Sequence, residues 1–532
     1  MKDKVIFWCG FDFTQFCMAY SFQKKYDCEM YSIIDITNST KKFFETQKLV
    51  NFKKIWFLHD QYEYGKTKPD IEYLKNFEKK YNIDLWKLAI NERMFYGFFN
   101  YHKFTSNEIL SIMEQICRFY EKFFEEVKPD YFITKLTAFH HLELFRRMCI
   151  FHGVKVLMLS SPKTPKRNII SESDTKFDFI DNLDHIDCPN KSFSGLREEL
   201  QSINGKTTTR ELAMNYWNKH ASSSKFNSLR VFLHYLISPE KNLRTHYNYY
   251  GRTKISVIKN TFELLLRKKS RESFMDRYFT KNPSMDTRYV YFPLGIVLER
   301  HILIDAPYYT NQVELIRHIV KSLPVGYRLL VKEHPAQESR EWRTISEYKQ
   351  ILDIPNVTLI HPSFSDQELQ KNCSLIISTA GGSAFEATFY EKPSIIFGDA
   401  IYSYLSSVNQ VTSMERLPEA IKTSLNTKVD SHNLAKYMKV LSSNLIDFSF
   451  AEFFTEFVGR FAFSGGYNDI EINESELESF LKEKTDSLEY LAMCHIEKIN
   501  QHKAQNLKKR RKSKPRMAMT KTTKKKIPKI NN

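Results

Sequence analysis

The sequence predicts an α/β protein with two similar halves, each a parallel sheet with helices on both faces. Over the first 160 residues, short apolar runs alternate with longer amphipathic runs. Such alternation is typical of parallel strands that are joined by helices. It begins again near residue 288, after a polar, basic and aromatic stretch that lacks it. At 532 residues the chain is long enough for two or three domains.

The first half contains five strand candidates and two long helix candidates. Apolar residues at helical spacing predict helices at 106–127, with Ser106 as the N-terminal cap, and at 139–153, which ends in glycine. Each strand candidate is a short run of mostly apolar residues; these runs lie at 5–10, 30–35, 55–60, 131–134 and 154–160.

The second half repeats this pattern. Strands are expected at 289–294, 327–333, 357–360, 374–379 and 394–398. Helices are expected at 312–323, 365–372, 383–390 and 413–425. Open parallel sheets bind ligands outside the carboxyl ends of their strands. Two such halves therefore predict a ligand site in a cleft between them.

These elements divide the chain into five parts. Two Rossmann-like domains are separated by a basic helical connector and are followed by aromatic-rich helices and a tail. We place the first domain at 1–190, the connector at 191–287, the second domain at 288–445, the C-terminal helices at 446–500 and the tail at 501–532.

The net charge of +17 is concentrated in the connector and the tail. Residues 503–532 contain 13 Lys and Arg but no Asp or Glu, which predicts a disordered tail that tethers the protein to an anionic membrane. Residues 191–288 hold 19 basic and 8 acidic side chains. Within this range, basic residues are interleaved with Tyr in the segment 245–277, but no nucleic-acid-binding motif accompanies them. For this segment we therefore favour a solvated helical face or a surface that docks anionic polymer or lipid headgroups over specific nucleic-acid binding.

Composition also bears on location and metal binding. No run approaches the roughly 20 apolar residues that span a bilayer, and the start of the chain has no signal-peptide pattern. We expect a cytoplasmic protein that associates peripherally with the inner face of the cell membrane. The eight cysteines form no CxxC pair and no cluster with histidines, so neither a metal site nor a disulfide framework is predicted.

The segment IISTAGGSAFEATFYEKPSIIFG, at 376–398, is the first candidate binding site. A buried strand is expected to lead through a glycine turn into a helix, with Ser383 and Glu386 forming a capping box. Free N–H groups and the positive helix end suit a phosphate, although an ordinary β-to-α turn has the same pattern. The residues that would contribute are Ser378, Thr379, Gly381, Gly382 and Ser383.

A second candidate is the KEHP sequence at 332–335. Pro335 ends the strand, which places His334 at the carboxyl-end rim of the sheet. An imidazole can donate to a phosphate, and Lys332 can add positive charge; the alternative is a surface turn. Because KEHP and the glycine turn follow strands of one predicted sheet, we expect them to face the same cleft.

The first domain offers candidates for a general base. Asp12 follows the first strand, and His140 and His141 follow the strand at 131–134. A carboxylate or an imidazole at such a rim can accept a proton from a substrate. Polar residues are also common after strands, so a structural role is the alternative for each. Asp12 is our choice.

The second half resembles a known family. The runs YVYFPL, LIRHIVKSLPVGYRLLVKEHP, IPNVTLIHPSFSDQEL and LIISTAGGSAFEATFYEKPSIIFGD are similar to the capsular polysaccharide biosynthesis proteins. These are glycosyltransferases of the two-Rossmann-domain (GT-B) type and include Kdo transferases. Bacterial sialyltransferases, polysialyltransferases and the glycerophosphotransferases of teichoic acid synthesis are more distantly similar.

The resemblance implies roles for individual residues. In these relatives, the HP histidine and serine hydroxyls bind the phosphate of a cytidine nucleotide donor; the matching residues here are His334, Ser378, Thr379 and Ser383. Many GT-B enzymes also have an E-x4-G-x-P motif whose acid binds sugar or ribose hydroxyls. Glu386 matches that acid, and Glu391 stands in place of the glycine.

The resemblance therefore implies a GT-B-like, metal-independent glycosyltransferase. It would move a sugar from a CMP- or UDP-linked donor to a surface or capsular-type glycan or a lipid-linked acceptor. The first domain would bind the acceptor and the second the nucleotide-sugar. Asp12 and His334 are the catalytic candidates, and Lys332, His334 and the turn residues with Glu386 would hold the donor. A CDP-polyol phosphotransferase and a non-catalytic scaffold in glycan assembly are the alternatives.

Overall fold

A computed structural model gives the structure of the chain. It describes residues 2–513, except for Thr37, Tyr64, 98–100, Pro165, Phe179, Asp181, Arg340, 463–471 and, apart from Leu233, Leu236 and Ile237, residues 205–249. Residues 245–249 of the segment 245–277 and the tail beyond Ser513 lie outside the described residues.

The N-terminal domain is built on a six-stranded sheet in the order β3-β2-β1-β4-β5-β6. Five strands are parallel, and β6 pairs with β5 antiparallel at one edge. The strands are β1 (Lys4–Gly10), β2 (Glu29–Asp35), β3 (Lys54–Phe57), β4 (Tyr131–Lys135), β5 (Lys155–Ser160) and β6 (Ile169–Ser171).

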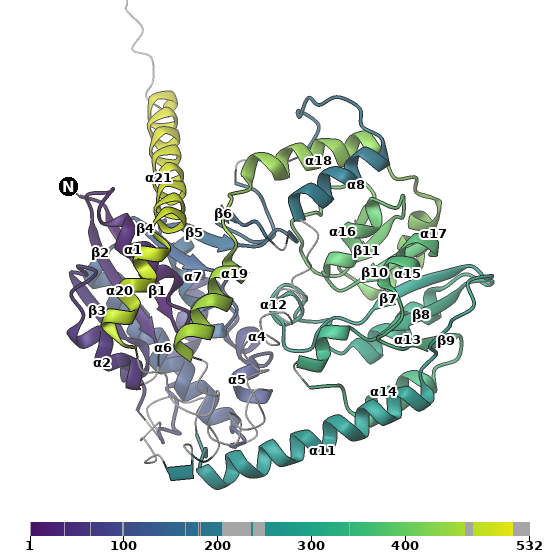
Figure 1. The fold of residues 1–532 in the computed structure, drawn as a ribbon, viewed down its shortest axis with the longest axis horizontal. Coiled ribbons are helices and arrows are strands. Elements are labelled where there is room, and N and C mark those ends of the chain that lie inside the picture. Colours follow the sequence, from purple (N-terminus) through teal and green to yellow (C-terminus); the bar gives the residue numbers. More distant parts are fainter. Residues whose placement is uncertain are drawn as a thin grey trace, which may run out of the picture.

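Helices cover both faces of this sheet (Figure 1). One face packs through Ile6 and Trp8 against α6 and α7, and the other packs through Val5 and Phe7 against α1. The helices are α1 (Thr14–Phe22), α2 (Asn38–Thr46), α3 (Ile71–Tyr81), α4 (Leu85–Ala89), α5 (Arg93–Tyr96), α6 (Ser106–Val127) and α7 (His140–Phe151).

The C-terminal domain contains a parallel sheet in the order β12-β11-β10-β7-β8-β9. Its connectivity repeats that of the first sheet, because its first strand again lies in the middle and the next two strands extend the sheet to one side. The strands are β7 (Tyr289–Pro293), β8 (Arg328–Lys332), β9 (Val357–Ile360), β10 (Leu375–Ser378), β11 (Ser394–Ile396) and β12 (Val408–Gln410). The helices after β7 are α12 (Arg300–Leu303), α13 (Gln312–Ser322), α14 (Ile345–Leu352), α15 (Asp366–Asn372), α16 (Gly382–Thr388), α17 (Leu417–Asn426) and α18 (Ser431–Asn444).

Some helices pack on the domain from which they are separated in sequence. Although it precedes the second domain in sequence, α8 (Phe193–Asn204) packs there against α16 and α18. Conversely, α19 (Phe450–Phe457), α20 (Glu474–Glu483) and α21 (Thr485–Ser513) return to the N-terminal domain, where they join the core of α1. The connector helix α11 (Lys254–Tyr278) runs along the edge of the molecule between the two domains (Figure 1).

The predicted fold class is confirmed: the chain forms two α/β domains with the strand order of a doubly wound sheet. Some local predictions were wrong. Thr105, not Ser106, caps α6, and it forms a capping box with Glu108. The basic tail expected to be disordered from residue 501 is helical up to Ser513, since α21 continues that far, and Lys503 pairs with Asp3 at 2.6 Å. None of the helices among the described residues combines the length and the hydrophobicity that a bilayer crossing needs.

Candidate functional site

The two predicted phosphate motifs lie on either side of one strand end. Because the sheet order is β10-β7-β8, the end of β7 separates KEHP from the glycine turn. The strand that lies between the two motifs in sequence, β9, pairs with the outer edge of β8, so it does not separate the motifs in the sheet. The carboxyl ends of three adjacent parallel strands therefore form one rim.

Gly295, just beyond β7, allows close packing at the centre of this rim. A Cβ atom built there would lie 3.3 Å from Thr379 Oγ1, 3.3 Å from His301 Nε2 and 2.7 Å from Ile302 Cδ1. Any side chain at this position would displace its neighbours. The glycine therefore lets an imidazole of α12 approach a hydroxyl that follows β10, which the sequence analysis missed.

His334 presents a hydrogen-bond donor at this rim. Its Nδ1 atom accepts a hydrogen bond of 3.1 Å from the backbone N–H of Ala336. In the neutral imidazole the proton must then reside on Nε2. Partial burial lowers the pKa of His334, so this neutral form dominates at pH 7. His334 can thus donate from Nε2 to an anionic oxygen, as predicted for a phosphate ligand.

The other two polar residues of KEHP are engaged in the protein. Lys332 is buried, and its Nζ atom lies 2.6 Å from Asp366 Oδ2, which argues against the predicted contact with a phosphate. Glu333 is fully buried, where it accepts from Arg343 and, at 2.9 Å, from the hydroxyl of Tyr348. Both side chains fix the end of β8 and thereby the position of His334.

The glycine turn differs from the predicted capping box. Gly381 is the N-cap, α16 begins at Gly382, and no side chain caps the helix. Glu386 accepts a hydrogen bond of 3.0 Å from Gln370, so it does not bond back to Ser383. The prediction placed the cap two residues too late, because the extended backbone at Gly381 starts the helix without help from a hydroxyl.

Hydroxyl groups and N–H groups still converge at this turn. Ser378 Oγ accepts from the N–H of Gly381 at 3.0 Å, which leaves its own proton to donate elsewhere. Both Ser378 and Thr379 are nearly buried, so they contact only a ligand that enters the rim. The first N–H groups of α16, like those of any helix, have no partner within the helix.

Lys163 brings a positive charge from the opposite domain. It lies in the loop after β5, and its Cδ atom is 3.9 Å from the Cβ position of Gly382. The loops at the carboxyl ends of the two sheets therefore meet at the glycine turn. The sequence signal was weak, because Lys163 is one of two lysines in a polar loop after a predicted strand.

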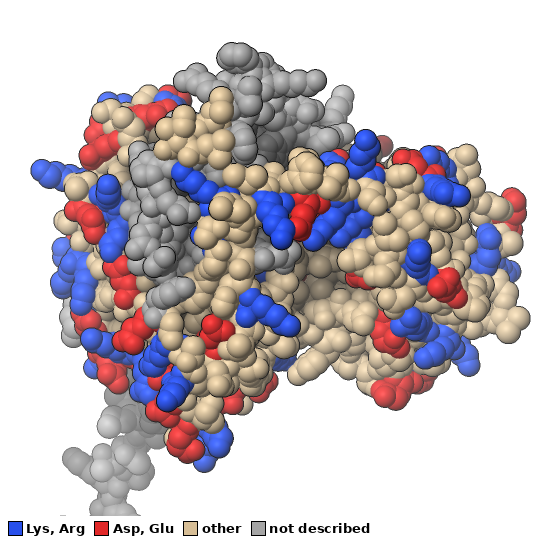
Figure 2. All heavy atoms as spheres, turned by 90° about the horizontal axis from the view of Figure 1, so that it is seen from below, with Lys and Arg blue, Asp and Glu red and all other residues tan. Residues whose placement is uncertain are grey.

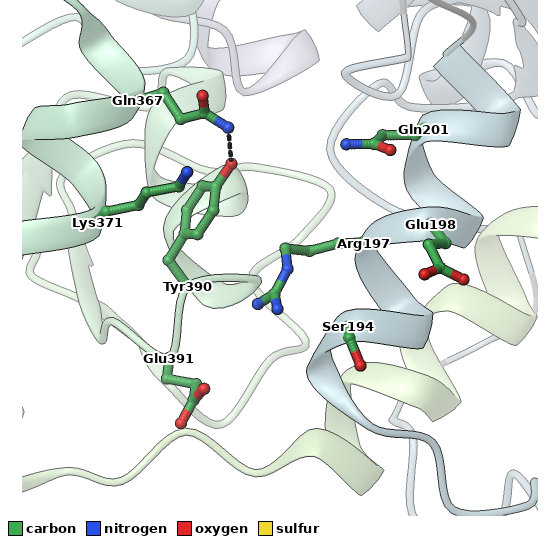
Figure 3. Close-up of a pocket in the computed structure, with 8 residues that line it drawn as sticks. All are labelled: Ser194, Arg197, Glu198, Gln201, Gln367, Lys371, Tyr390 and Glu391. Atoms are coloured by element: carbon green, nitrogen blue, oxygen red, sulfur yellow. Dashed lines mark hydrogen bonds between the residues drawn. The ribbon is translucent and has the colours of Figure 1, made fainter.

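Two hollows lie between α8 and the C-terminal domain, adjoining this region. The smaller has a volume of about 270 Å³ and includes Glu386, Gln370 and Asp366. The larger, of about 420 Å³, has Arg197 and Gln201 of α8 facing Tyr390 (Figure 3). Tyr390 accepts a hydrogen bond of 2.7 Å from Gln367.

Glu391 lies at the edge of the larger hollow, where the related motif has glycine. Its φ of 62° is in the left-handed region, which costs little for glycine but is strained for other residues. Glu391 therefore adopts the backbone conformation that glycine adopts most easily.

On the N-terminal side, Asp12 is enclosed. Its side chain has no exposed surface, and it forms an ion pair with Lys135 at the end of β4. Oδ1 also accepts from the N–H of Thr14 at 3.1 Å. In this conformation the carboxylate cannot contact a substrate unless Lys135 moves.

His140 and His141 are buried and bound to carboxylates. His140 Nδ1 lies 3.0 Å from Glu92, and His141 Nε2 lies 2.9 Å from Asp35. His59 contacts the other oxygen of Asp35, also at 2.9 Å. Burial opposes the ionisation of Asp35, but the two histidines hold its pKa well below the usual range. This cluster favours a structural role for both predicted bases.

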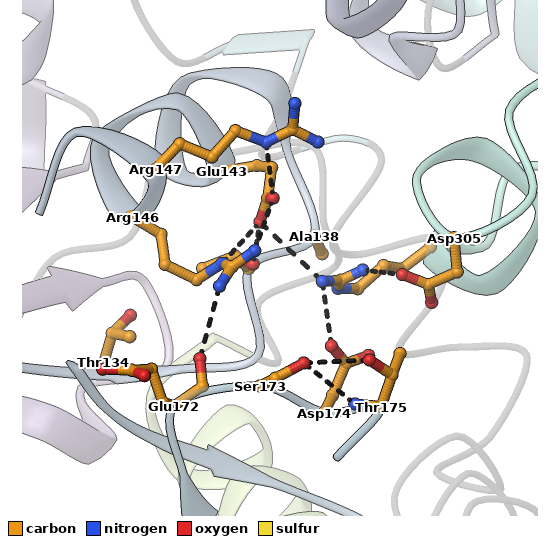
Figure 4. Close-up of polar contacts among 12 residues, drawn as sticks. Thr134, Ala138, Glu143, Arg146, Arg147, Glu172, Ser173, Asp174, Thr175 and Asp305 are labelled. Carbon is orange, nitrogen blue, oxygen red and sulfur yellow. Dashed lines mark hydrogen bonds and ion pairs between the residues drawn. The ribbon is translucent and has the colours of Figure 1, made fainter. Parts of the chain in front are cut away.

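A buried ionic cluster joins the domains beside the site (Figure 4). Arg300 of the C-terminal domain lies 3.0 Å from Asp174 and 3.7 Å from Glu143 of the N-terminal domain, and it also pairs with Asp305. Arg146 and Arg147 bind Glu143 as well. Burial raises the pKa of Asp305 to about 7, although Arg300 opposes this shift. Across the described ranges, no group of histidine, cysteine or carboxylate side chains is placed to hold a metal ion.

The fold and the rim define a class of protein: two Rossmann-like domains with a predicted phosphate site where their strand-end loops meet. Residues 210–450 match the model of the family described as capsule polysaccharide biosynthesis protein. The resemblance predicted from the sequence is thereby confirmed over this range. No curated protein is significantly similar to the chain.

Among solved structures, the chain is similar to UDP-GlcNAc 2-epimerase from Methanocaldococcus jannaschii, in complex with UDP-GlcNAc and UDP. The identity is 13%, 83% of this chain and 99% of that chain are covered, and the TM-score is 0.24. It is also similar to the Thermosulfurimonas dismutans KpsC β-Kdo 2,7 transferase, with 11% identity, coverage of 61% and 89%, and a TM-score of 0.27. Because these values are low, the fold assignment rests on the strand order of the two sheets.

Proposed function

We propose that this protein is a glycosyltransferase that transfers a sugar from a CMP- or UDP-linked donor to a surface or capsular-type glycan. One observation carries the proposal: the Nε2 donor of His334 and the glycine turn flank the end of the same central strand. The family match over 210–450 supports it, because that range includes both motifs.

The donor phosphates would bind at this rim. His334 Nε2, the hydroxyls of Ser378 and Thr379 and the N–H groups after Gly381 offer donors to their oxygens. Lys163 replaces Lys332 as the neighbouring cation, because Lys332 is paired with Asp366. Such fixed donors stabilise the negative charge that develops on a departing nucleotide. Lys163 comes from the other domain, so it also links phosphate binding to the contact between the domains.

Glu386 would bind hydroxyl groups of the ribose or the donor sugar. It is exposed on the smaller hollow beside Gln370 and one turn along the helix from Ser383. A carboxylate and an amide on one side of a hollow can accept from and donate to neighbouring hydroxyls. Gly382 and Ser383 complete the set of donor-site residues that we propose.

The acceptor, a glycan or a lipid-linked glycan, would bind on the N-terminal domain. Asp12 remains our proposed general base, and it acts only if the acceptor displaces Lys135 from its carboxylate. We also propose a cytoplasmic location with peripheral attachment to the anionic inner face of the membrane.

The reaction is tested by incubating the full chain with radiolabelled CMP- and UDP-sugars and a capsular-type glycan. We expect nucleotide release coupled to glycosidic bond formation. His334→Ala should lower the rate about 100-fold, as removal of one transition-state donor does. His361→Ala is the matched control, since His361 also precedes a proline after a strand but lies at the sheet edge, where it contacts Ser363 at 2.6 Å. Formation of a phosphodiester from a CDP-polyol, without glycosyl transfer, would contradict the proposal.

A further inference from the structure

One face of the connector helix α11 carries exposed apolar side chains where a solvated helix has polar ones. Ile255, Phe262 and Leu266 are 79%, 64% and 56% exposed, and Leu265 beside them is 63% exposed. The opposite face is fixed on the protein, because Val257, Arg271 and Met275 are buried there. The apolar face therefore points outward in a defined orientation.

Basic side chains continue the same outward stripe. Residues that recur every three or four positions lie on one side of a helix. This spacing places Lys259, Lys269 and Arg277 on the side of Ile255, Phe262, Leu266 and Ser273. The stripe of α11 thus consists of these seven residues, and it contains no Asp or Glu.

The acidic residues near the stripe are already paired. Glu263 lies 3.0 Å from Arg267 and 3.9 Å from Lys259, and Asp276 lies 2.7 Å from Lys281. Lys269 and Arg277, at the other end of the stripe, are exposed to solvent. Figure 2 looks at this side of the molecule, and Lys and Arg side chains lie across the middle of the view, with uncharged and a few acidic side chains among them.

The apolar surface extends beyond the helix. Lys254 donates from Nζ to the backbone carbonyl of Leu236 at 2.9 Å. The next residue, Ile237, is 83% exposed. A second exposed aliphatic side chain thus lies near the N-terminal end of the stripe, where Ile255 begins it.

We propose that the stripe of α11 binds an anionic lipid membrane, with its apolar residues inserted between headgroups and its cations on their phosphates. Aliphatic and aromatic side chains flanked by Lys and Arg are the composition of helices that lie in a membrane interface. Contiguous exposed apolar groups on a helix mark an interaction surface. The charge complementarity with anionic headgroups favours a membrane over a protein partner, whose interface core is depleted in lysine.

The stripe is separate from the basic C-terminal region. In Figure 1, α21 projects from the side of the molecule opposite α11. Membrane contact through α11 therefore does not depend on the end of the chain. The inference deepens the proposed peripheral attachment and rests on that part of the proposed function alone, so its failure would leave the donor site unaffected.

The test measures binding of the full chain to vesicles of phosphatidylcholine with and without 30% phosphatidylglycerol. We expect binding only to the anionic vesicles, and the double variant Phe262→Ser/Leu266→Ser should weaken it about tenfold without changing the thermal midpoint. The matched control is Tyr308→Ser/Val325→Ser, which removes two residues that are 77% and 103% exposed elsewhere. The control should bind as the wild type does.

A second measurement separates insertion from general attraction by charge. Phe262→Trp should show additional quenching by brominated lipid in anionic vesicles, relative to the wild type. The proposal is overturned if this tryptophan is not quenched, or if the double serine variant binds as the wild type does. It is also overturned if light scattering shows that the stripe forms a dimer contact in solution that the serine substitutions abolish while vesicle binding persists.

Discussion

Replacement of Arg300 by methionine should weaken the contact between the domains and destabilise the protein. Arg300 is 7% exposed, and its guanidinium contacts Asp174 at 3.0 Å and Glu143 at 3.7 Å in the N-terminal domain. It also pairs with Asp305 in its own domain. Loss of one partner of a buried ion pair leaves a charge without compensation, which typically costs about 3–5 kcal/mol.

For Arg300→Met we expect a loss of stability near the lower end of that range. Glu143 keeps Arg146 and Arg147, so it is not left unpaired. Asp305 has a pKa of about 7 even with Arg300 present, so it can take up a proton when Arg300 is removed. The unpaired carboxylate of Asp174 therefore accounts for most of the lost stability. We expect a loss of about 3 kcal/mol at pH 8, and a smaller loss at pH 6, where Asp305 is already mostly protonated.

Scanning calorimetry at both pH values measures this effect. Arg317→Met is the matched control, because Arg317 is 37% exposed and pairs with Glu314 three residues away on α13, a contact worth at most about 0.5 kcal/mol. Arg300→Met should also separate the unfolding of the two domains into distinct transitions. The reasoning is refuted if Arg300→Met and Arg317→Met unfold alike at pH 8, or if the penalty is larger at pH 6.

Three further substitutions test other parts of the structure. Since burial raises the pKa of Asp305 to about 7, its contribution to stability is present at acidic pH and is lost as the pH rises through 7; Asp305→Asn should lose less stability than the wild type between pH 5 and pH 8 in denaturant titrations. Glu391→Gly should raise stability by less than about 1 kcal/mol, because relief of left-handed strain is partly offset by glycine's backbone entropy, whereas Glu391→Ala should give no gain. Gly295→Ala should weaken nucleotide binding in calorimetric titrations, since the added methyl displaces His301 and Thr379 along with Ile302; unchanged binding would count against the rim as the donor site.

The sequence predicted the strands in the middle of each sheet well, because a strand buried on both faces is a continuous apolar run. The edge strand at 357–360 also has the predicted ends, because its mostly apolar run is as long as the strand, and helix α6 spans the predicted 106–127. The edge strands β6 and β12 were missed, since neither of these three-residue strands lies in an apolar run long enough to detect. The packing of α19–α21 on the first domain could not be predicted from local patterns either, because an apolar helix face does not specify which core it joins.

The candidate site was predicted in part. The positions of His334 and the glycine turn at strand ends follow from the chain pattern, but the direction of a side chain does not. Lys332 alternates with Val331 along β8, and only the tertiary structure places its ammonium group on Asp366. Lys163 and His301 come near the turn through contacts between distant segments, which no local signal records. The roles of all these residues in binding remain predictions.

Calorimetric titration of the full chain with CMP and UDP tests the proposed donor site most directly. We predict that one of these nucleotides binds, and that His334→Ala weakens its binding by a factor of about 10 to 100, which is the worth of one hydrogen bond to a charged group. His361→Ala should bind as the wild type does. Binding of neither nucleotide, or equal binding by the wild type and His334→Ala, would contradict the proposal that this rim holds a nucleotide phosphate.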